Sequence, residues 1–462
     1  MPAAASSAPV STPEARPQRR IPVDHWLAPD LVFVAFALVL TIAAVMAGNV
    51  RLAGRAGLQL QGIDPAYYFG IAHSLIFDHD FDLTNELRVL QPVSTHAGGF
   101  AGIHGKPGSP YAIGYSLLSI PFIALGTLVD RIAGNPMDGY STYVMYSYRI
   151  ELVILSVTGL LLLTRALQRI GVGARAAMFV SFVMFFGTSV GYYTFSPMSH
   201  ASTFMAASAF LLCWLRVRES GRVRDWLLLG AIGGCLSVCR WQDSVFLMAP
   251  LLCDLIRERG LRHWRGWGVY MAVIPIWWVP QFLEWKAIYG RFLLIPQGSG
   301  FLQFPPRYVL EVLFSTNHGW FLWTPLTLIG VAGLLYGAVR LSREYVPWLV
   351  VIALEVAVIG SMPTNWNCRD SFSIRSLTSC VPLVAVGFAL LFKKRQLRVP
   401  VALAAIVCAV FSTLFAVQFR LDLIPRQSAL SWEQVFAGKA RLMMSPLGVL
   451  RGRGANQTDR SN

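Results

Sequence analysis

Residues 62–86 read GIDPAYYFGIAHSLIFDHDFDLTNE, an acidic stretch in a chain that is otherwise apolar and basic. The stretch gathers five carboxylates, which are Asp64, Asp78, Asp80, Asp82 and Glu86. It directly follows the first long apolar run of the chain. Whether the chain is soluble or spans a membrane therefore decides where these acids lie and what they can do.

The composition is that of a membrane protein. Of the 462 residues, 55% are hydrophobic and only 14% are charged, whereas soluble domains average about 25% charged residues. Apolar runs of about 17–25 residues, the length that crosses a bilayer as a helix, recur from Leu31 to Gln418. The excess of 39 Lys and Arg over 24 Asp and Glu is typical of basic cytoplasmic loops and gives no reason to expect nucleic acid. We therefore expect an all-α polytopic membrane protein.

The apolar runs predict about eleven transmembrane helices, at residues 30–49, 144–164, 176–194, 199–215, 226–240, 243–256, 267–284, 318–338, 345–361, 376–392 and 399–418. Residues 1–29, rich in Pro, Ala and Ser, are expected to be disordered and cytoplasmic. The run at 112–129 is long enough to cross, but a crossing there would place the basic cluster after residue 164 outside. We therefore expect it to lie along the outer interface, inside a first extracytoplasmic segment at 50–143. The basic tail 419–462 then also lies outside, which the positive-inside rule disfavours.

Asp64 and Pro65 mark the start of a short helix. Asp is a preferred N-cap residue and Pro is favoured at the first helical position. Tyr68, Ile71 and Leu75 then follow at helical spacing and give the helix an apolar face. Asp64 is either a helix cap or a general base that accepts a proton from an acceptor group, and the residues alone favour neither reading.

A metal site is the less favoured interpretation of the acids at 78–82. Alternating acids can chelate a hard cation, but an EF-hand loop requires Gly after the third acid, and Leu83 stands there. None of the seven cysteines forms a CxxC pair, so no cysteine-type zinc site is expected. We expect a solvated turn without a metal.

Ionisable and polar groups recur in the expected outer loops, where such residues at membrane depth are candidates for function. They lie in HGKPGSPYAIGYSLL (104–118), SPMSH (196–200), RWQD (240–243) and WNCRDSFSIR (366–375). Arginines in these loops can clamp a phosphate bidentately, and Lys106 can hold one as a point charge. The loops therefore predict a cavity with carboxylates on one side and cations on the other.

These motifs resemble the GT-C superfamily of integral-membrane glycosyltransferases. In that family an acidic residue begins a juxtamembrane helix after the first span, which is the place of Asp64. The segment HGKPGSPYAIGYSLL resembles the family's basic-proline element, GGCLSVCRWQDSVF (233–246) its GLAxxxRxxD-like segment, and WNCRDSFSIR its late WxxxxSFGxR loop. Two positions depart from the pattern: Ile63 stands where many members have a second acid, and Ser373 replaces a glycine. Asp82 or Asp243 could therefore substitute for Asp64 as the base.

The resemblance implies transfer of a sugar from a polyprenyl-phosphate donor to a lipid, glycan or protein acceptor, with inversion at the anomeric carbon. Since no large soluble domain follows the last span, a single-sugar donor is expected. Asp64 is the expected catalytic base, and the expected ligands of the donor phosphate are Lys106, Arg369, Arg375 and Arg240. The expected substrate-binding residues are His104, Tyr67, Asp82, His200, Gln242, Asp243, Trp366 and Asp370.

No cofactor is expected to be required, with a divalent cation, Mg²⁺ or Mn²⁺, left open. The expected location is the bacterial inner membrane, with the site facing the periplasm. The alternative is a transporter or flippase of a lipid-linked glycan. Such a protein would bury ionisable groups near the middle of the membrane. Glu355 inside the ninth expected span is the clearest such residue, with Glu151 near the start of the second, but most ionisable groups fall in the outer loops.

Overall fold

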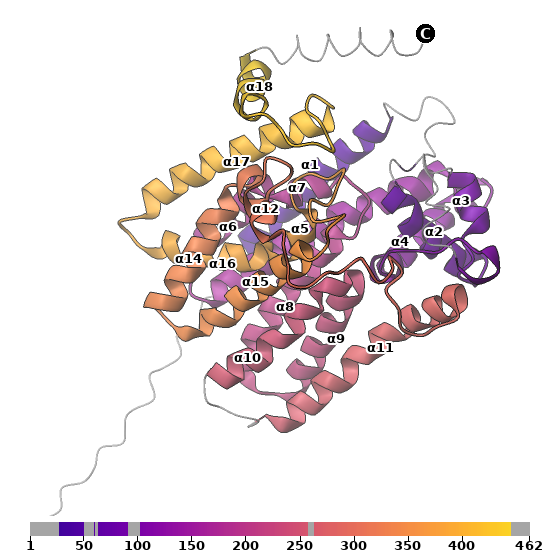
Figure 1. Ribbon diagram of the computed structural model, residues 1–462, viewed down its shortest axis with the longest axis horizontal. Helices are drawn as coiled ribbons and strands as arrows, with labels where there is room; N and C mark the ends of the chain where they lie inside the picture. Colours follow the sequence, from indigo (N-terminus) through magenta and orange to yellow (C-terminus); the bar gives the residue numbers. More distant parts are fainter. Residues whose placement is uncertain (1–26, 50–59, 61–62, 91–101, 257–262, 445–462) are drawn as a thin grey trace, which may run out of the picture.

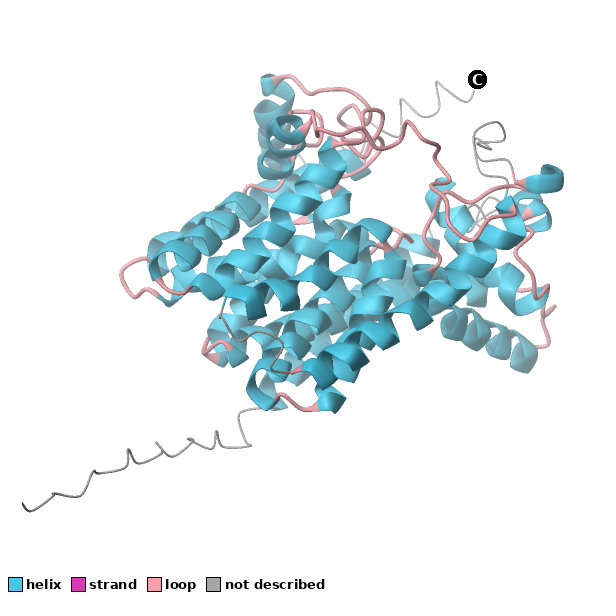
Figure 2. Ribbon diagram, turned by 60° about the horizontal axis from the view of Figure 1, so that its bottom comes forward, coloured by secondary structure: helices cyan, strands magenta, loops and turns pink. Residues whose placement is uncertain are grey.

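The computed structural model describes residues 27–49, 60, 63–90, 102–256 and 263–444. Within these residues every regular element is a helix (Figure 2). The expected all-α fold is therefore confirmed. The predicted disorder of the N-terminus lies almost wholly outside the described residues, and so does the end of the C-terminal tail.

Each span predicted from the sequence contains a helix (Figure 1), but those at 176–194, 243–256 and 318–338 are each divided between two elements. These helices are α1 (Leu27–Asn49), α5 (Thr142–Arg169), α6 (Ala174–Gly187), α8 (His200–Ser220), α9 (Val223–Cys239), α10 (Ala249–Ile256), α11 (Trp264–Tyr289), α14 (Leu326–Arg340), α15 (Val346–Gly360), α16 (Val381–Lys393) and α17 (Arg398–Arg420). By length and composition five stretches of the described chain suffice to cross a membrane: Gly114–Ala133, Thr142–Arg169, His200–Ser220, Arg375–Lys393 and Arg398–Arg420. The number of crossings remains a prediction.

The remaining helices are shorter or lie in the connecting segments. They are α2 (Ile63–Phe77), α3 (Thr84–Leu90), α4 (Gly114–Ala133), α7 (Ser189–Tyr193), α12 (Val309–Phe314), α13 (Trp320–Trp323) and α18 (Trp432–Met444), with 3₁₀ turns η3 (Ile103–Gly105), η4 (Trp241–Met248), η5 (Arg343–Tyr345) and η6 (Arg375–Cys380). Figure 1 shows α2, α3 and α4 grouped at one side of the bundle. The acidic stretch and the expected interfacial helix therefore form one unit beside the long helices.

An ion pair fixes the relative direction of α1 and α5. Arg165, near the end of α5, lies 2.6 Å from the carboxylate of Asp30, near the start of α1. The two helices are therefore antiparallel, and the segment between them leaves and re-enters the bundle on one side. Although α4 is long enough to cross the membrane, a single crossing by α4 would bring the chain to the opposite side before α5 begins, which is incompatible with antiparallel α1 and α5. Its orientation in the membrane remains a prediction.

Close helix packing in the bundle depends on glycine. On α16 a Cβ atom added at Gly387 would lie 2.0 Å from the carbonyl oxygen of Gly330 on α14. Only a residue without a side chain allows the two backbones to approach in this way, as small residues do at other membrane helix interfaces.

The end of α17 lies beside the loops that the sequence placed outside. Arg420 donates to the carbonyl of Phe195 at 3.1 Å, and Arg426 pairs with Asp370 at 3.1 Å. These two basic residues of the tail thus have partners on the face that carries the late loop.

Candidate active site

Asp64 lies in the first turn of α2, which begins one residue earlier than the cap that the sequence predicted. Its Oδ1 accepts a hydrogen bond from the Tyr111 hydroxyl at 2.6 Å. Its Oδ2 lies 2.9 Å from Nη2 of Arg375, and the side chains of this ion pair are 19% and 17% exposed. The carboxylate is therefore held by two donors and still reachable from outside.

Arg375 reaches Asp64 because the late loop, residues 361–375, folds back over the bundle. The backbone N–H of Phe372 donates to the Tyr193 hydroxyl at 2.9 Å, which attaches the loop to α7. The loop turns sharply at three residues with left-handed backbone, which are Cys368, Arg369 and Ser373 with φ of 54°, 45° and 56°. Ser373 is the position where the GT-C pattern has glycine, the residue that adopts this conformation without steric cost.

Arg240 provides a second guanidinium at the C-cap of α9. Its Nη2 donates to the Ser376 hydroxyl at 2.8 Å, and its Nη1 lies 3.5 Å from both Ser199 Oγ and His200 Nδ1. Since Ser376 directly follows Arg375, the two arginines are tied to the same turn of η6. Arg240 Nε is buried and finds no acceptor among the described residues.

Tyr68 joins the carboxylate side of the cluster to the cationic side. Its hydroxyl donates to Ser199 at 3.2 Å, and its ring packs 5.1 Å from that of Tyr111. Burial raises the pKa of the Tyr68 hydroxyl, and the nearby charge of Arg240 partly offsets this. Burial likewise raises the pKa of Tyr111 well above its ordinary value, so both hydroxyls act as neutral hydrogen-bond donors.

Gln242, Asp243, His200 and Tyr67, which the sequence placed in the site, support this cluster. Gln242 donates to the carbonyl of Ser376 at 3.1 Å, and the buried Asp243 accepts from Ser379 at 2.9 Å. The ring of His200 packs on that of Tyr193, with centroids 4.3 Å apart. Tyr67 is buried, with its ring centroid 5.6 Å from that of Tyr111.

Lys106 and Asp82 form a second polar pair. Lys106 Nζ lies 3.5 Å from Asp82 Oδ2, and both side chains are about one-third exposed. The Thr84 hydroxyl donates to Asp82 at 2.6 Å and holds the pKa of that carboxyl below its ordinary value. His104, two residues before Lys106, is exposed in a left-handed turn.

Three further expected site residues occupy the outer surface of the late loop. Arg369 is exposed and donates to the carbonyl of Thr364 at 3.0 Å. Asp370 pairs with Arg426. Trp366 stacks parallel on Tyr308, with ring centroids 5.8 Å apart. Of the two arginines expected in this loop, Arg375 is the one that the fold brings to Asp64.

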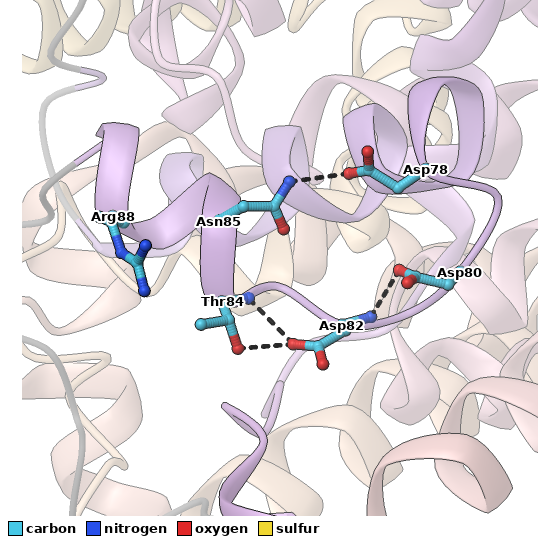
Figure 3. A pocket seen from close by; sticks show the side chains of 6 residues that line it. All are labelled: Asp78, Asp80, Asp82, Thr84, Asn85 and Arg88. Atoms are coloured by element: carbon cyan, nitrogen blue, oxygen red, sulfur yellow. Dashed lines mark hydrogen bonds between the residues drawn. The ribbon is translucent and has the colours of Figure 1, made fainter.

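The acids after α2 form a turn rather than an EF-hand loop (Figure 3). Asp80 Oδ1 accepts from the backbone N–H of Asp82 at 2.9 Å, and Asp78 Oδ2 accepts from Asn85 at 2.8 Å. A cavity of about 380 Å³ opens between these side chains and Arg88. Next to it His73, Asp78 and Glu86 offer potential metal-ligating atoms within 4.8 Å of one another.

Three residues of the central cluster were not assigned to it from the sequence: Tyr111, Tyr68 and Ser376. Tyr68 fits the apolar face of α2, and its neighbour Tyr67 was assigned instead. The presence of Tyr111 in the basic-proline segment was a signal, because a buried tyrosine usually finds a partner for its hydroxyl. Nothing in the local sequence distinguishes Ser376 from the serines around it.

Comparisons with known proteins identify the fold. No protein-family model matches the sequence, and no curated protein matches it. Among solved structures, the chain resembles ArnT from Cupriavidus metallidurans bound to undecaprenyl phosphate, with a TM-score of 0.53, 13% identity and coverage of 94% of this chain and 74% of that one. It also resembles the apo oligosaccharyltransferase of Archaeoglobus fulgidus, with a TM-score of 0.51, 13% identity and coverage of 86% of this chain and 55% of that one.

The chain thus spans little more than half the length of the archaeal protein. Both solved structures are GT-C membrane glycosyltransferases. The predicted GT-C fold is therefore confirmed.

Proposed function

We propose that this chain, which has the GT-C fold, is a glycosyltransferase that moves a single sugar from a polyprenyl-phosphate donor to an extracytoplasmic acceptor. The donor class is supported by the undecaprenyl phosphate bound to the structurally similar ArnT. The observation that carries the proposal is the contact of the Asp64 carboxylate with Arg375, while Arg240 binds the residue that follows Arg375.

In this mechanism Asp64 is the general base. The acceptor O–H or N–H attacks the anomeric carbon, its proton passes to Asp64, and the bond from that carbon to the phosphate oxygen breaks. Attack from the face opposite the leaving group inverts the anomeric centre. Positioned proton transfer of this kind contributes about 10²–10⁴-fold to a rate.

The leaving polyprenyl phosphate takes the electron pair of the broken bond and gains negative charge. Arg375 and Arg240 would stabilise it, since preorganised cations aimed at developing charge are a major source of catalysis. Before the donor binds, Arg375 is held by Asp64. The phosphate would compete for Arg375 and thereby release Asp64 to accept the proton.

Lys106 would also hold the donor, through a phosphate oxygen that replaces Asp82 as its partner. The two guanidinium groups would supply the charge stabilisation in this mechanism. The acceptor is a lipid, glycan or protein, and we place the enzyme in the bacterial inner membrane with its site facing the periplasm.

The test is transfer from a panel of radiolabelled polyprenyl-phosphate sugars by the purified chain, with wild type compared with Asp64→Asn. We expect one donor to be used and Asp64→Asn to lose at least 100-fold in kcat. Asp138→Asn is the matched control, because Asp138 is an exposed acid of the same outer segment, and it should retain full activity. Normal transfer by folded Asp64→Asn would refute the base assignment. Donor binding without transfer to any acceptor would instead favour the transporter or flippase.

A further inference from the structure

A buried histidine at the far end of α2 lies outside the candidate active site. His73 is 4% exposed, and at a rise of about 1.5 Å per residue it lies roughly 13 Å along the helix from Asp64. Its neighbours come from three segments: Glu86 on α3, Asp78 in the turn after α2, and the backbone of Asp138 before α5. None of these groups has a role in the proposed transfer.

The hydrogen bonds of His73 determine which ring nitrogen carries the proton. Nε2 lies 2.9 Å from the carbonyl oxygen of Asp138, and a carbonyl can only accept, so Nε2 is the protonated nitrogen. Nδ1 is therefore the ring nitrogen that can ligate a metal ion. Nδ1 lies 3.1 Å from Glu86 Oε1 and 3.4 Å from the Tyr140 hydroxyl. Nδ1 thus faces a carboxylate oxygen at a distance that a shared proton or a metal ion can bridge.

The side chain of Glu86 supplies a second, independent indication of a binding site. Its side chain is 0% exposed, and its Oε2 has no hydrogen-bond partner in the part of the chain that the structure describes. Oε1 accepts from Asn85 at 3.2 Å. A buried carboxylate oxygen without a donor is costly unless it is neutralised or binds a metal.

We propose that His73, Asp78 and Glu86 bind a first-row divalent metal ion, Zn²⁺ or Mn²⁺. The three ligand atoms lie within 4.8 Å of one another, and bonds of about 2.0–2.2 Å require only a small closure of this triangle. The imidazole ligand suits Zn²⁺ and the two carboxylates also suit Mn²⁺, whereas Mg²⁺ and Ca²⁺ prefer oxygen ligands alone. The bond from Nε2 to the Asp138 carbonyl is the outer contact that typically orients a metal-binding histidine.

The cavity between Asp78, Asp80 and Asp82 gives solvent access to this site (Figure 3). A water from it completes the fourth position, because three protein ligands leave a zinc ion open. The role of the ion is structural. It joins the end of α2 to α3 and to the segment before α5, and so holds the turn that presents Asp82 to Lys106. This proposal does not depend on the proposed transfer reaction.

The test is metal binding by the full-length chain, purified with a tag that contains no histidine and stripped with a chelator. ZnCl₂ and MnCl₂ are added separately, bound metal is counted by mass spectrometry after gel filtration, and Zn²⁺ affinity is measured against a chromophoric indicator. We expect one equivalent per chain and a higher Tm with either ion. MgCl₂ and CaCl₂ at the same concentration should give no such rise.

Three variants and one control identify the ligands. His73→Ala, Glu86→Gln and Asp78→Asn should each weaken Zn²⁺ binding at least tenfold. His79→Asn, an exposed histidine next to Asp78 with φ of 57°, should bind as wild type does, since Asn tolerates that conformation. Asp78 is exposed, so Asp78→Asn keeps the test valid if a buried variant does not fold. Wild-type protein that binds no equivalent of either ion, or Asp78→Asn that binds with unchanged affinity, would overturn the proposal.

Discussion

The carboxylate of Asp64 and the guanidinium of Arg375 lie 2.9 Å apart, although one residue opens the acidic stretch near the start of the chain and the other ends the late loop. Tyr111 completes the pair with a hydrogen bond of 2.6 Å to the second carboxylate oxygen. A proposed base, the cation that restrains it and a neutral donor are thus assembled from three distant segments.

Arg375→Gln should raise the KM for the polyprenyl-phosphate donor at least tenfold, which corresponds to about 1.4 kcal/mol. The variant removes a bidentate phosphate donor and leaves Asp64 without its counter-ion. Arg375→Lys should recover part of the loss, because charge is restored without the planar fork. Arg369→Gln is the comparison from the same loop and should change KM less, since Arg369 is exposed. Equal effects of the two glutamine variants would contradict the assignment.

Tyr111→Phe should lower kcat/KM several-fold. The variant keeps the ring that packs on Tyr68 and removes only the hydroxyl that positions Asp64. A single hydrogen bond to a charged group is worth about 1.5–3 kcal/mol, which sets the upper size of the effect. Tyr143→Phe on the exposed face of α5 serves as the control. Steady-state kinetics with the donor varied would show whether the loss falls on kcat, as positioning of the base requires.

Ser373→Gly should stabilise the protein by about 1 kcal/mol. The serine has a left-handed backbone with φ of 56°, which costs an L-residue about 1–2 kcal/mol. Its buried hydroxyl also finds no partner in the described residues. The extra chain entropy of glycine in the unfolded state offsets part of the gain. Thermal unfolding in detergent measures the shift of Tm. Ser371→Gly should instead lower Tm, because the Ser371 hydroxyl donates to the carbonyl of Ser373.

Asp82→Asn should lower Tm at pH 7, and the difference from wild type should shrink as pH falls below 3.8. The folded state lowers the pKa of Asp82 from 3.8, mainly through the Thr84 hydroxyl. For an acid with a lowered folded pKa, the stabilisation is complete above the unfolded pKa and is lost as pH falls through the folded value. Thr84→Val should reduce the same pH dependence. A Tm difference for Asp82→Asn that persists unchanged below pH 3.8 would contradict this account.

Asp138→Cys and Arg224→Cys should be labelled from opposite sides of the membrane by an impermeant thiol reagent. Both positions are exposed. Asp138 belongs to the segment between α1 and α5, and Arg224 lies in the first turn of α9. Six native cysteines are buried and Cys408 is half-buried, so a Cys408→Ser background keeps other labelling low. Labelling of Asp138→Cys only after the membrane is opened to the cytosolic side would refute the proposed periplasmic site.

The sequence by itself determined the helices. Apolar runs predicted each long helix, because a segment without charges must bury its backbone polar groups in its own hydrogen bonds to cross a membrane. The pair Asp64 and Pro65 likewise predicted a helix here, although α2 begins at Ile63, one residue before the predicted cap. The same local signals identified Asp64, Arg240 and Arg375 as candidates.

Only the tertiary structure decided which of these groups meet. Arg369 and Arg375 carry the same side chain and lie in one loop, so the sequence does not distinguish them. Left-handed turns at Cys368, Arg369 and Ser373 direct this loop, and Arg375 is the one of the two that reaches Asp64. Tyr111 and Glu86 acquire their roles in the same way, through burial beside groups far away in the sequence. Hydrophobic periodicity encodes which face of a helix is buried, whereas contacts between polar groups depend on how the helices pack. The arrangement of the acids and arginines therefore could not be read from the sequence pattern alone.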